Sequence, residues 1–425
     1  MKVKRLKMTS FRGISDMTLD FQTDEPNVLI GINGVGKSSI LDCLAILLYG
    51  FVASIRFPSS TERLFSDQDI TNTHQETHKE ITIQLDWQQV TWSLTSVRTG
   101  SSKKASSELS QLPALVDNIR QQLETNSNAN IPLAVYYGVD RTVIETPLEI
   151  FPEAYFKPID AYEQAITLKQ INFSNFFQWF RALEDVENEE RRDNPDYRDR
   201  QLEAVRLAIA SVAPDFSKLR VRRSPLRMTV TKQGQELTVN QLSDGEKCLL
   251  AMVGDLAIRL AIANPSLENP LQGEGVVLID EIELHLHPKW QRKIIPALTR
   301  TFPNCQFIVT THSPQVISEV KPNGIYILEA TSLRQGSVTT EGVVAKRPES
   351  SYGRDSNRIL EDLMDTPARP QEIKDHLLEL FRLIDKGDLD GARQLRQQIV
   401  DEIGESEPEL VKASVSIRRK EILSR

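Results

Sequence analysis

The sequence predicts an α/β fold followed by an all-helical C-terminal region, and three observations support this class. A short apolar strand at 27–30 leads through a glycine-rich loop into an apolar helix. Later apolar runs end in polar residues, as the buried strands of a parallel sheet do. From about residue 341 the chain shows helical periodicity separated by proline and glycine. We therefore expect a head over residues 1–340 and a helical domain over 341–425.

Bulk composition narrows the class of protein further. With 425 residues and a formal net charge of −8, the chain has room for two or three domains, and DNA contact would need a local basic patch or a partner. Cys43, Cys248 and Cys305 lie far apart in apolar runs, as reduced core cysteines do. The start lacks an apolar leader, and no run approaches the about 18 apolar residues of a membrane helix. We expect a cytoplasmic protein without membrane contact.

The first twenty residues alternate apolar and polar positions on both sides of Gly13, which predicts a hairpin. Arg12 lies next to this turn. Since the hairpin precedes the glycine-rich loop, Arg12 could bring a guanidinium to a bound anion, or it could be a solvated surface residue.

The segment GINGVGKSS matches the phosphate-binding pattern G-x-x-x-x-G-K-[ST] between a strand and a helix. Its glycines let main-chain N–H groups wrap a polyphosphate where a Cβ would intrude. Lys37 would reach the β- and γ-phosphates and Ser38 would ligate magnesium, while the helix from Ser39 onward would direct its positive end at the phosphates. The predicted nucleotide-binding residues of this loop are Gly31, Asn33, Gly34, Gly36, Lys37, Ser38 and Ser39.

The middle of the chain alternates between strand and helix patterns. Residues 81–98 read as an antiparallel hairpin and 109–124 as a helix. The apolar strand at 131–137 would bring three polar residues to its carboxyl end, where ligands bind in open α/β sheets: Tyr137, Asp140 and Arg141.

A helical hairpin with a solvated tip is expected at 173–212, where Asn194-Pro195 interrupts the helical pattern. The basic strand that follows, at 218–232, would form either a phosphate-facing stripe or a solvated face. Its arginines are Arg220, Arg222, Arg223 and Arg227.

Further polar residues stand where a helix starts and where two strands end. Ser243 is a good N-cap, and Glu246 completes a capping box. Asp280 and Glu281 end an apolar strand, a costly place for two carboxylates unless they serve a metal or a water. Asp280 would hold magnesium together with the loop serine, and Glu281 would deprotonate the attacking water. His312 ends the last strand, placed to touch the γ-phosphate or that water.

Two histidines, His285 and His287, flank a leucine, and an H-x-H pair also suggests zinc. No third ligand follows at suitable spacing, so zinc is the less favoured reading.

The order of these motifs, FRGI, GINGVGKS, LSDGEK, VVLIDE, LHLHP and TTHSP, resembles that of the ABC-type ATPases of the SMC and RecF class over about residues 1–330. The resemblance implies an ABC-type P-loop ATPase head, with a mixed sheet, an antiparallel subdomain and a helical lobe, that uses ATP and Mg²⁺. Matched residue by residue, the glycine-rich loop is Walker A, Asp280 and Glu281 are Walker B with its catalytic glutamate, and His312 is the switch histidine. Leu284–Pro288 lies where the D-loop belongs, and Arg12 matches an arginine that reaches the nucleotide.

In this class the signature of a second subunit completes the site. The resemblance therefore implies a head-to-tail homodimer, or a higher oligomer of dimers, in which Ser243, Gly245 and Glu246 contact the ATP of the partner. The class also has a Q-loop glutamine, which is missing at the end of the strand at 131–137. Tyr137 or Arg141 would have to replace it.

The tail around Tyr352–Pro370 most resembles the ATPase subunit of the Septu antiphage system, which works with a separate HNH-type nuclease. This resemblance implies an ATPase that is not itself a nuclease, regulates such a partner and meets DNA directly or through it. Two alternatives stay open: a RecF-like DNA repair clamp, and a slow module whose assembly ATP controls.

Overall fold

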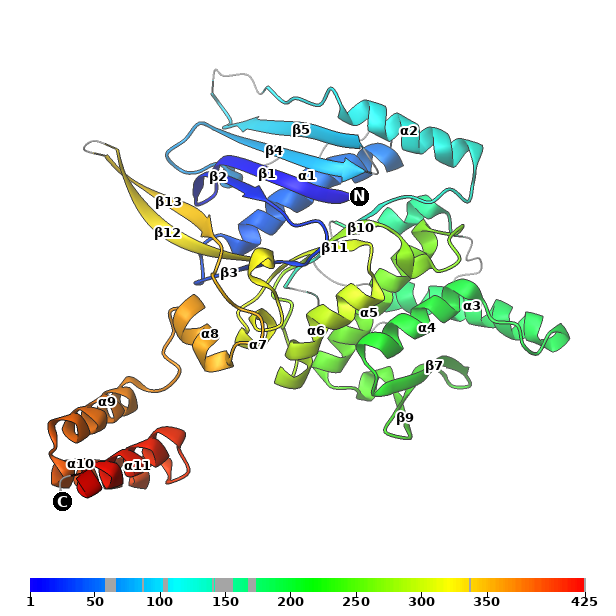
Figure 1. Cartoon of the computed structure of the whole chain (residues 1–425). Helices are drawn as coiled ribbons and strands as arrows, with labels where there is room; N and C mark the ends of the chain where they lie inside the picture. Colours follow the sequence, from blue (N-terminus) through cyan, green and yellow to red (C-terminus); the bar gives the residue numbers. More distant parts are fainter. Residues whose placement is uncertain are drawn as a thin grey trace. The chain divides into compact units, whose positions relative to one another are not determined.

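A computed structural model describes residues 1–57, 66–85, 88–101, 106–139, 141, 156–166, 173–335 and 338–423. The chain divides into two units, Met1–Arg354 and Asp355–Arg425 (Figure 1). The division falls after Arg354 rather than near residue 340, because a hairpin continues the sheet of the first unit to Lys346. We call the first unit the head and the second the helical unit.

A mixed six-stranded sheet is the centre of the head. Its order is β13-β12-β3-β11-β10-β6, in which only the edge strand β13 is antiparallel to its neighbour. The carboxyl ends of β3, β11, β10 and β6 therefore meet at one edge. The strands are β3 (Asn27–Gly31), β6 (Leu133–Tyr137), β10 (Gly275–Ile279), β11 (Cys305–Thr310), β12 (Ile325–Gln335) and β13 (Val338–Lys346).

A second, antiparallel sheet has the order β2-β1-β4-β5 and confirms both predicted hairpins. Helix α1 (Lys37–Arg56) contacts strands of both sheets, and α2 (Leu112–Thr125) packs on α1 and β5 (Figure 1). The strands are β1 (Lys2–Phe11), β2 (Ile14–Asp20), β4 (Glu76–Leu85) and β5 (Gln88–Val97).

Helix α1 corrects one expectation from the sequence. By length and composition it could cross a membrane, although no such run was predicted. In the structure 72% of its apolar window is buried inside the head, as in the core helix of a globular domain. Cys43, on this helix, is one of three free, buried cysteines, as predicted.

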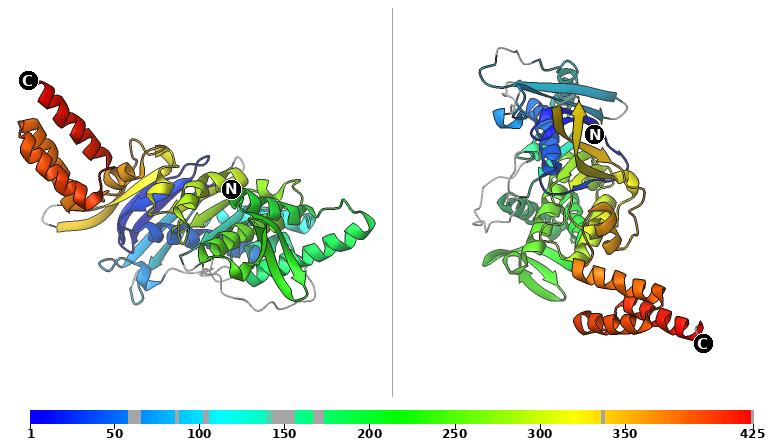
Figure 2. Two further views of the ribbon diagram at one scale, coloured as in Figure 1. Left: turned by 90° about the horizontal axis from the view of Figure 1, so that it is seen from below. Right: turned by 90° about the vertical axis from the view of Figure 1, so that its left-hand side faces the viewer.

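The helical lobe contains the predicted hairpin of α3 (Phe173–Asp193) and α4 (Arg200–Val212), together with α5 (Asp244–Ala263). The tip of the α3–α4 hairpin extends beyond the rest of the head (Figures 1 and 2). Helices α6 (Pro288–Thr301) and α7 (Pro314–Ile317) connect the later strands of the main sheet.

The basic segment forms two strands of a small sheet rather than one strand. This sheet consists of β7 (Phe216–Arg223), β8 (Leu226–Lys232) and β9 (Gln235–Thr238), with a turn at Ser224-Pro225.

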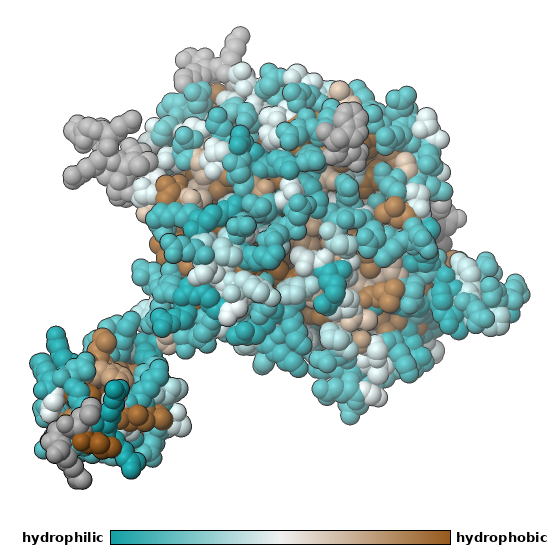
Figure 3. All heavy atoms as spheres, viewed as in Figure 1, coloured by the Kyte–Doolittle hydropathy of each residue, from teal (hydrophilic) through white to brown (hydrophobic). Residues whose placement is uncertain are grey.

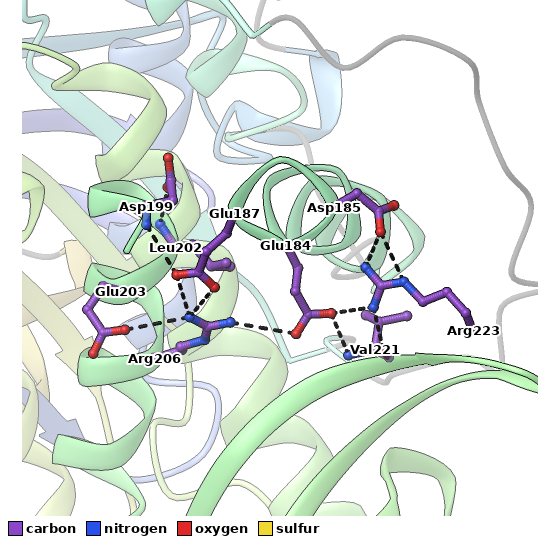
Figure 4. A network of polar contacts seen from close by, with 9 residues as sticks. All are labelled: Glu184, Asp185, Glu187, Asp199, Leu202, Glu203, Arg206, Val221 and Arg223. Atoms are coloured by element: carbon purple, nitrogen blue, oxygen red, sulfur yellow. Dashed lines mark hydrogen bonds and ion pairs between the residues drawn. The ribbon is translucent and has the colours of Figure 1, made fainter. Parts of the chain in front are cut away.

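Three of the four arginines of this sheet face carboxylates, whereas Arg227 donates to the main-chain carbonyl of Pro225 at 3.5 Å. Arg220 and Arg222 both donate to Glu236, at 2.5 and 2.6 Å, while Arg223 donates to Glu184 and Asp185 of α3 (Figure 4). Since each of these three guanidinium groups has an acidic partner, the paired surface face is favoured over the phosphate-facing stripe.

The predicted helical character of the tail is confirmed, and its described residues form four helices. Asp388 accepts a hydrogen bond from the Gly391 amide at 2.9 Å and caps α10. Leucine, isoleucine and alanine side chains of α9, α10 and α11 form a core of their own. The helices are α8 (Ser356–Leu363), α9 (Gln371–Lys386), α10 (Leu389–Ile403) and α11 (Pro408–Leu423).

Candidate ATP site

The glycine-rich loop connects β3 to α1 in the head. Gly31, Gly34 and Gly36 have φ angles of +148°, +80° and +109°, which glycine adopts readily and other residues rarely do. A Cβ at Gly31 would lie 2.5 Å from the carbonyl oxygen of Leu328 on β12. The helix begins at Lys37, two residues earlier than expected, so its first turn directly follows the loop.

Lys37 is 7% exposed and lies back over the loop. Its Nζ donates to the carbonyl oxygens of Gly31 and Ile32, at 2.8 and 2.9 Å. Burial lowers the pKa of Lys37, while Asp280, Glu281 and Glu283 act in the opposite direction. The loop lysine and the carboxylates after β10 therefore lie near one another. Asn33 and Ser38 are exposed beside them, and Ser39 is half-buried.

Asp280 and Glu281 follow β10 at the same edge of the sheet. Thr310, at the end of β11, donates its hydroxyl to the Asp280 carboxylate at 2.5 Å and accepts the Glu281 N–H at 2.7 Å. Asp280 is 3% exposed, so its negative charge is removed from solvent. Glu281 has a φ of +48°, an unusual value for a residue with a side chain.

His312 joins this group through a residue that the sequence analysis did not identify. Glu283 accepts a hydrogen bond from the Thr311 hydroxyl at 2.7 Å and another from the main-chain N–H of His312. The only sequence signal for Glu283 and Thr310 is the presence of polar residues just after or at the end of apolar strands.

Arg12 lies beside α1 but bonds to carboxylates. It donates to Asp42 at 2.6 Å and to Asp69 at 3.0 Å, and Tyr136 donates to the other oxygen of Asp42 at 3.0 Å. Burial alone would raise the pKa of Asp69, but hydrogen bonds from Ser66 and Arg12 lower it. A contact between Arg12 and ATP stays a prediction.

A buried lysine lies close to Arg12. Lys79 of β4 is fully buried, with its Nζ 5.2 Å from the centre of the Phe11 ring. Burial lowers the pKa of Lys79 to about 7.

Both residues suggested in place of the Q-loop glutamine contact Walker B: the Tyr137 main-chain carbonyl accepts the Asp280 N–H at 2.8 Å, and Arg141 makes its contact through the side chain. Tyr137 is buried and donates its hydroxyl to Asp255 of α5 at 2.7 Å. The guanidinium of Arg141 donates to the main-chain carbonyls of Asp280 and Glu281. Asp140, also predicted at this strand end, lies outside the described residues.

The signature segment forms the predicted capping box at the start of α5. Ser243 donates from its main-chain N–H and its hydroxyl to Glu246, at 3.0 and 2.9 Å. Burial would raise the pKa of Glu246, but hydrogen bonds from Lys232 and Ser243 lower it. Ser243 and Asp244 face solvent. The hydrogen bonds that Ser243 makes to described residues therefore stay within the cap and the first turn of α5.

The predicted D-loop segment packs against this cap. A Cβ at Gly245 would lie 2.1 Å from the main-chain oxygen of His285. His287 accepts a hydrogen bond from the Lys289 amide at 3.2 Å and so caps α6. Among the described residues, no group of three or more histidine, cysteine or acidic side chains could hold a metal ion, which disfavours the zinc reading.

The head combines a P-loop at the start of α1, a carboxylate pair after β10 and a capped signature helix. These three features define the class of ABC-type ATPase heads. The chain belongs to the family described as "AAA domain, putative AbiEii toxin, Type IV TA system", whose model matches residues 27–318.

Several known proteins are similar to this chain. It is 30% identical to the Retron Vc95 probable ATPase of Vibrio cholerae, over 90% of this chain and 82% of that protein. It is 24% identical to Septu protein PtuA of Bacillus thuringiensis, over 85% of this chain and 84% of that protein. A crystal structure of an SMC head bound to the C-terminal winged-helix domain of ScpA aligns with a TM-score of 0.46 and 16% identity, covering 82% of this chain and 99% of that one. The retron relatives were not anticipated from the sequence.

Proposed function

We propose that this chain is the cytoplasmic, Mg²⁺-dependent ATPase subunit of an antiphage defence system. The observation that carries the proposal is the convergence of Lys37, Asp280 and Glu281 beside the glycine-rich loop. Burying the charges of Lys37 and Asp280 costs solvation, and a metal-bound triphosphate would compensate both signs of charge. The names of the retron and Septu relatives support the defence context.

The residues of the site suit phosphoryl transfer to water. Main-chain N–H groups of the loop and the Lys37 ammonium would bind the phosphates. Ser38 and Asp280 offer the hard oxygen donors that Mg²⁺ prefers, and the ion would neutralise charge on the phosphate oxygens. Glu281 would take a proton from the attacking water, and His312 would orient that water or the γ-phosphate.

The proposed active unit is a head-to-tail homodimer, or an oligomer of such dimers. The exposed cap at Ser243 and Gly245 would approach the γ-phosphate held by another subunit, with Glu246 fixing the cap from behind. ATP then binds the dimer better than the separate heads, so hydrolysis shifts the equilibrium toward separation.

The output of this cycle would be control of a separate HNH-type nuclease, with this chain not cutting DNA itself. The acidic partners of Arg220, Arg222 and Arg223 support DNA contact through the partner rather than through this basic sheet. On the face seen in Figure 3 the head is mostly hydrophilic, as expected of a subunit that associates reversibly.

The decisive experiment replaces Glu281 by glutamine. Glu281→Gln keeps the shape of the side chain and removes the base, so turnover should fall by about 100-fold or more while ATP still binds. Light scattering with ATP and Mg²⁺ should then show a trapped dimer. Glu268→Gln makes the same change at an exposed position away from the site, so this control should leave turnover unchanged. Normal turnover of Glu281→Gln would refute the role of Glu281.

A second experiment separates the proposed output from its alternatives. The tagged chain would be purified from its native host with and without ATP, and co-purifying chains would be identified by mass. An HNH-type nuclease whose cleavage depends on nucleotide supports the proposal. A homodimer with DNA-stimulated hydrolysis and no nuclease would instead support a repair clamp, and tight ATP binding without turnover would support an assembly module.

A further inference from the structure

Arg141 is a buried cation whose contacts are unusual. Its side chain is 2% exposed and donates to the main-chain carbonyls of Gly138, at 3.0 Å, and of Asp280 and Glu281. Within the described ranges, all hydrogen bonds of its guanidinium go to main-chain oxygens and none to a carboxylate. A guanidinium is a planar fork of donors, so one such group can fix several carbonyls at once.

The main chain that Arg141 contacts is strained. At a φ of +48°, Glu281 lies in the left-handed region, which is unfavourable for a residue with a side chain. Such a conformation persists only where surrounding contacts hold it. The Glu281 N–H is held by Thr310 at 2.7 Å, and its carbonyl accepts from the Leu284 amide at 2.9 Å and from Arg141.

Arg141 also connects this strained residue to the signature helix. Its own carbonyl oxygen lies 3.9 Å from the Cys248 sulfur, one turn after the cap of α5. Gly245, in the cap itself, packs on the carbonyl of His285, four residues after Glu281. Helix α5 and the segment after β10 therefore meet directly at Gly245 and indirectly through Arg141.

We propose that Arg141 is a positioning residue for hydrolysis: it holds the main chain of Glu281 in the conformation that aims the carboxylate, and it joins that conformation to the signature helix. The proposal rests on the proposed role of Glu281 as the base. Without the guanidinium, the Asp280 carbonyl loses a donor and the Glu281 carbonyl keeps the Leu284 amide, so Glu281 can relax toward negative φ, which rotates its side chain away from the reacting water.

The test compares Arg141→Gln and Arg141→Lys with the wild type in steady-state ATP hydrolysis. Arg141→Gln should lower kcat by about 10- to 100-fold, because small misplacements of a catalytic group have effects of this size. The KM for ATP should change less than about 2-fold, since the P-loop is intact. Arg141→Lys keeps the charge without the fork, so it should recover part of kcat. Arg300→Gln, an exposed arginine on α6, is the matched control and should behave as wild type.

A double variant shows whether Arg141 acts through Glu281. In the Glu281→Gln background, Arg141→Gln should cause no further loss of turnover. The inference would be overturned by a further loss of turnover in this background or by a wild-type kcat in both Arg141 variants. It would also be overturned if only ATP affinity or thermal stability fell. If Glu281→Gln alone turned over normally, the proposed function would fail first; if it is inactive while Arg141→Gln is normal, only this inference fails.

Discussion

The Walker and signature parts of the site are built in opposite ways. On the Walker side, buried charges and strained main chain are held by bonds from several elements, as in the contacts of Thr310 with Asp280 and Glu281. The signature side is a surface cap in which the exposed Ser243 donates to the buried Glu246. The first is therefore preformed within one chain, whereas the second is free to meet another surface. This asymmetry agrees with a site completed between two chains.

The largest effect is expected from disabling the Walker side. Lys37→Ala removes the cation at the phosphates and leaves the nearby carboxylates uncompensated. ATP binding, followed by calorimetry, should weaken by about 100-fold or more. Lys293→Ala, at an exposed position of α6, should bind as wild type. Full binding by Lys37→Ala would contradict the phosphate role of the loop.

Disabling the signature side should separate binding from hydrolysis. Ser243→Arg places a bulky cation on the exposed cap, so each chain should bind ATP normally while dimer formation is lost and turnover falls by about 10-fold or more. Because the change also removes an N-cap, worth about 1 kcal/mol, Asp199→Ala at the cap of α4 serves as the control and should hydrolyse normally.

Mixing the two defective chains sharpens the same comparison. A dimer of Lys37→Ala with Ser243→Arg contains one site with an intact Walker side and an intact signature. Hydrolysis should therefore rise on mixing above the low level of each variant alone. Failure to recover any activity would mean that a single chain supplies both parts.

A smaller effect, on thermal stability, is expected from changing pH at Lys79, the buried lysine close to Arg12. Burial lowers the pKa of Lys79 in the folded chain to about 7, from its ordinary value of 10.5, so the unfolded chain binds more protons between these values. Stability should therefore rise with pH across this window. Lys79→Met should raise Tm at pH 6.5 by about 3 °C, given about 2–4 °C per kcal/mol in a domain of this size.

The advantage of Lys79→Met should shrink toward pH 9.5, where the wild-type lysine is buried neutral. Lys293→Met, at an exposed position, should show no such trend. A constant difference in Tm at every pH would mean that the charge of Lys79 is not involved.

What the sequence predicted depended on local patterns. The P-loop, the strand ending in Asp280 and the cap at Ser243 were found because their spacing follows strand and helix geometry directly. Contacts between distant segments have no such spacing: nothing in the order of residues pairs Arg223 with Glu184, or Arg12 with Asp42. The arginine-rich segment was accordingly open to two readings until its acidic partners were known, of which Figure 4 shows those of Arg223.

Arg141 illustrates the same limit inside the site. Its place after an apolar strand suggested a ligand contact, which is a local inference. Its contacts with two main-chain carbonyls depend on how β6 lies beside β10, which only the assembled sheet reveals.

The strand order also has a consequence for biosynthesis. β3, which carries the P-loop, pairs with β11 and β12, although Val28 leaves the ribosome long before its partners Val309 and Ile325. Such distant pairings form late, because the intervening chain must first be made and closed into a loop. The nascent chain thus has no finished nucleotide pocket until most of it has been translated. Products of premature termination before β11 would lack that pocket and could not sequester ATP from complete molecules.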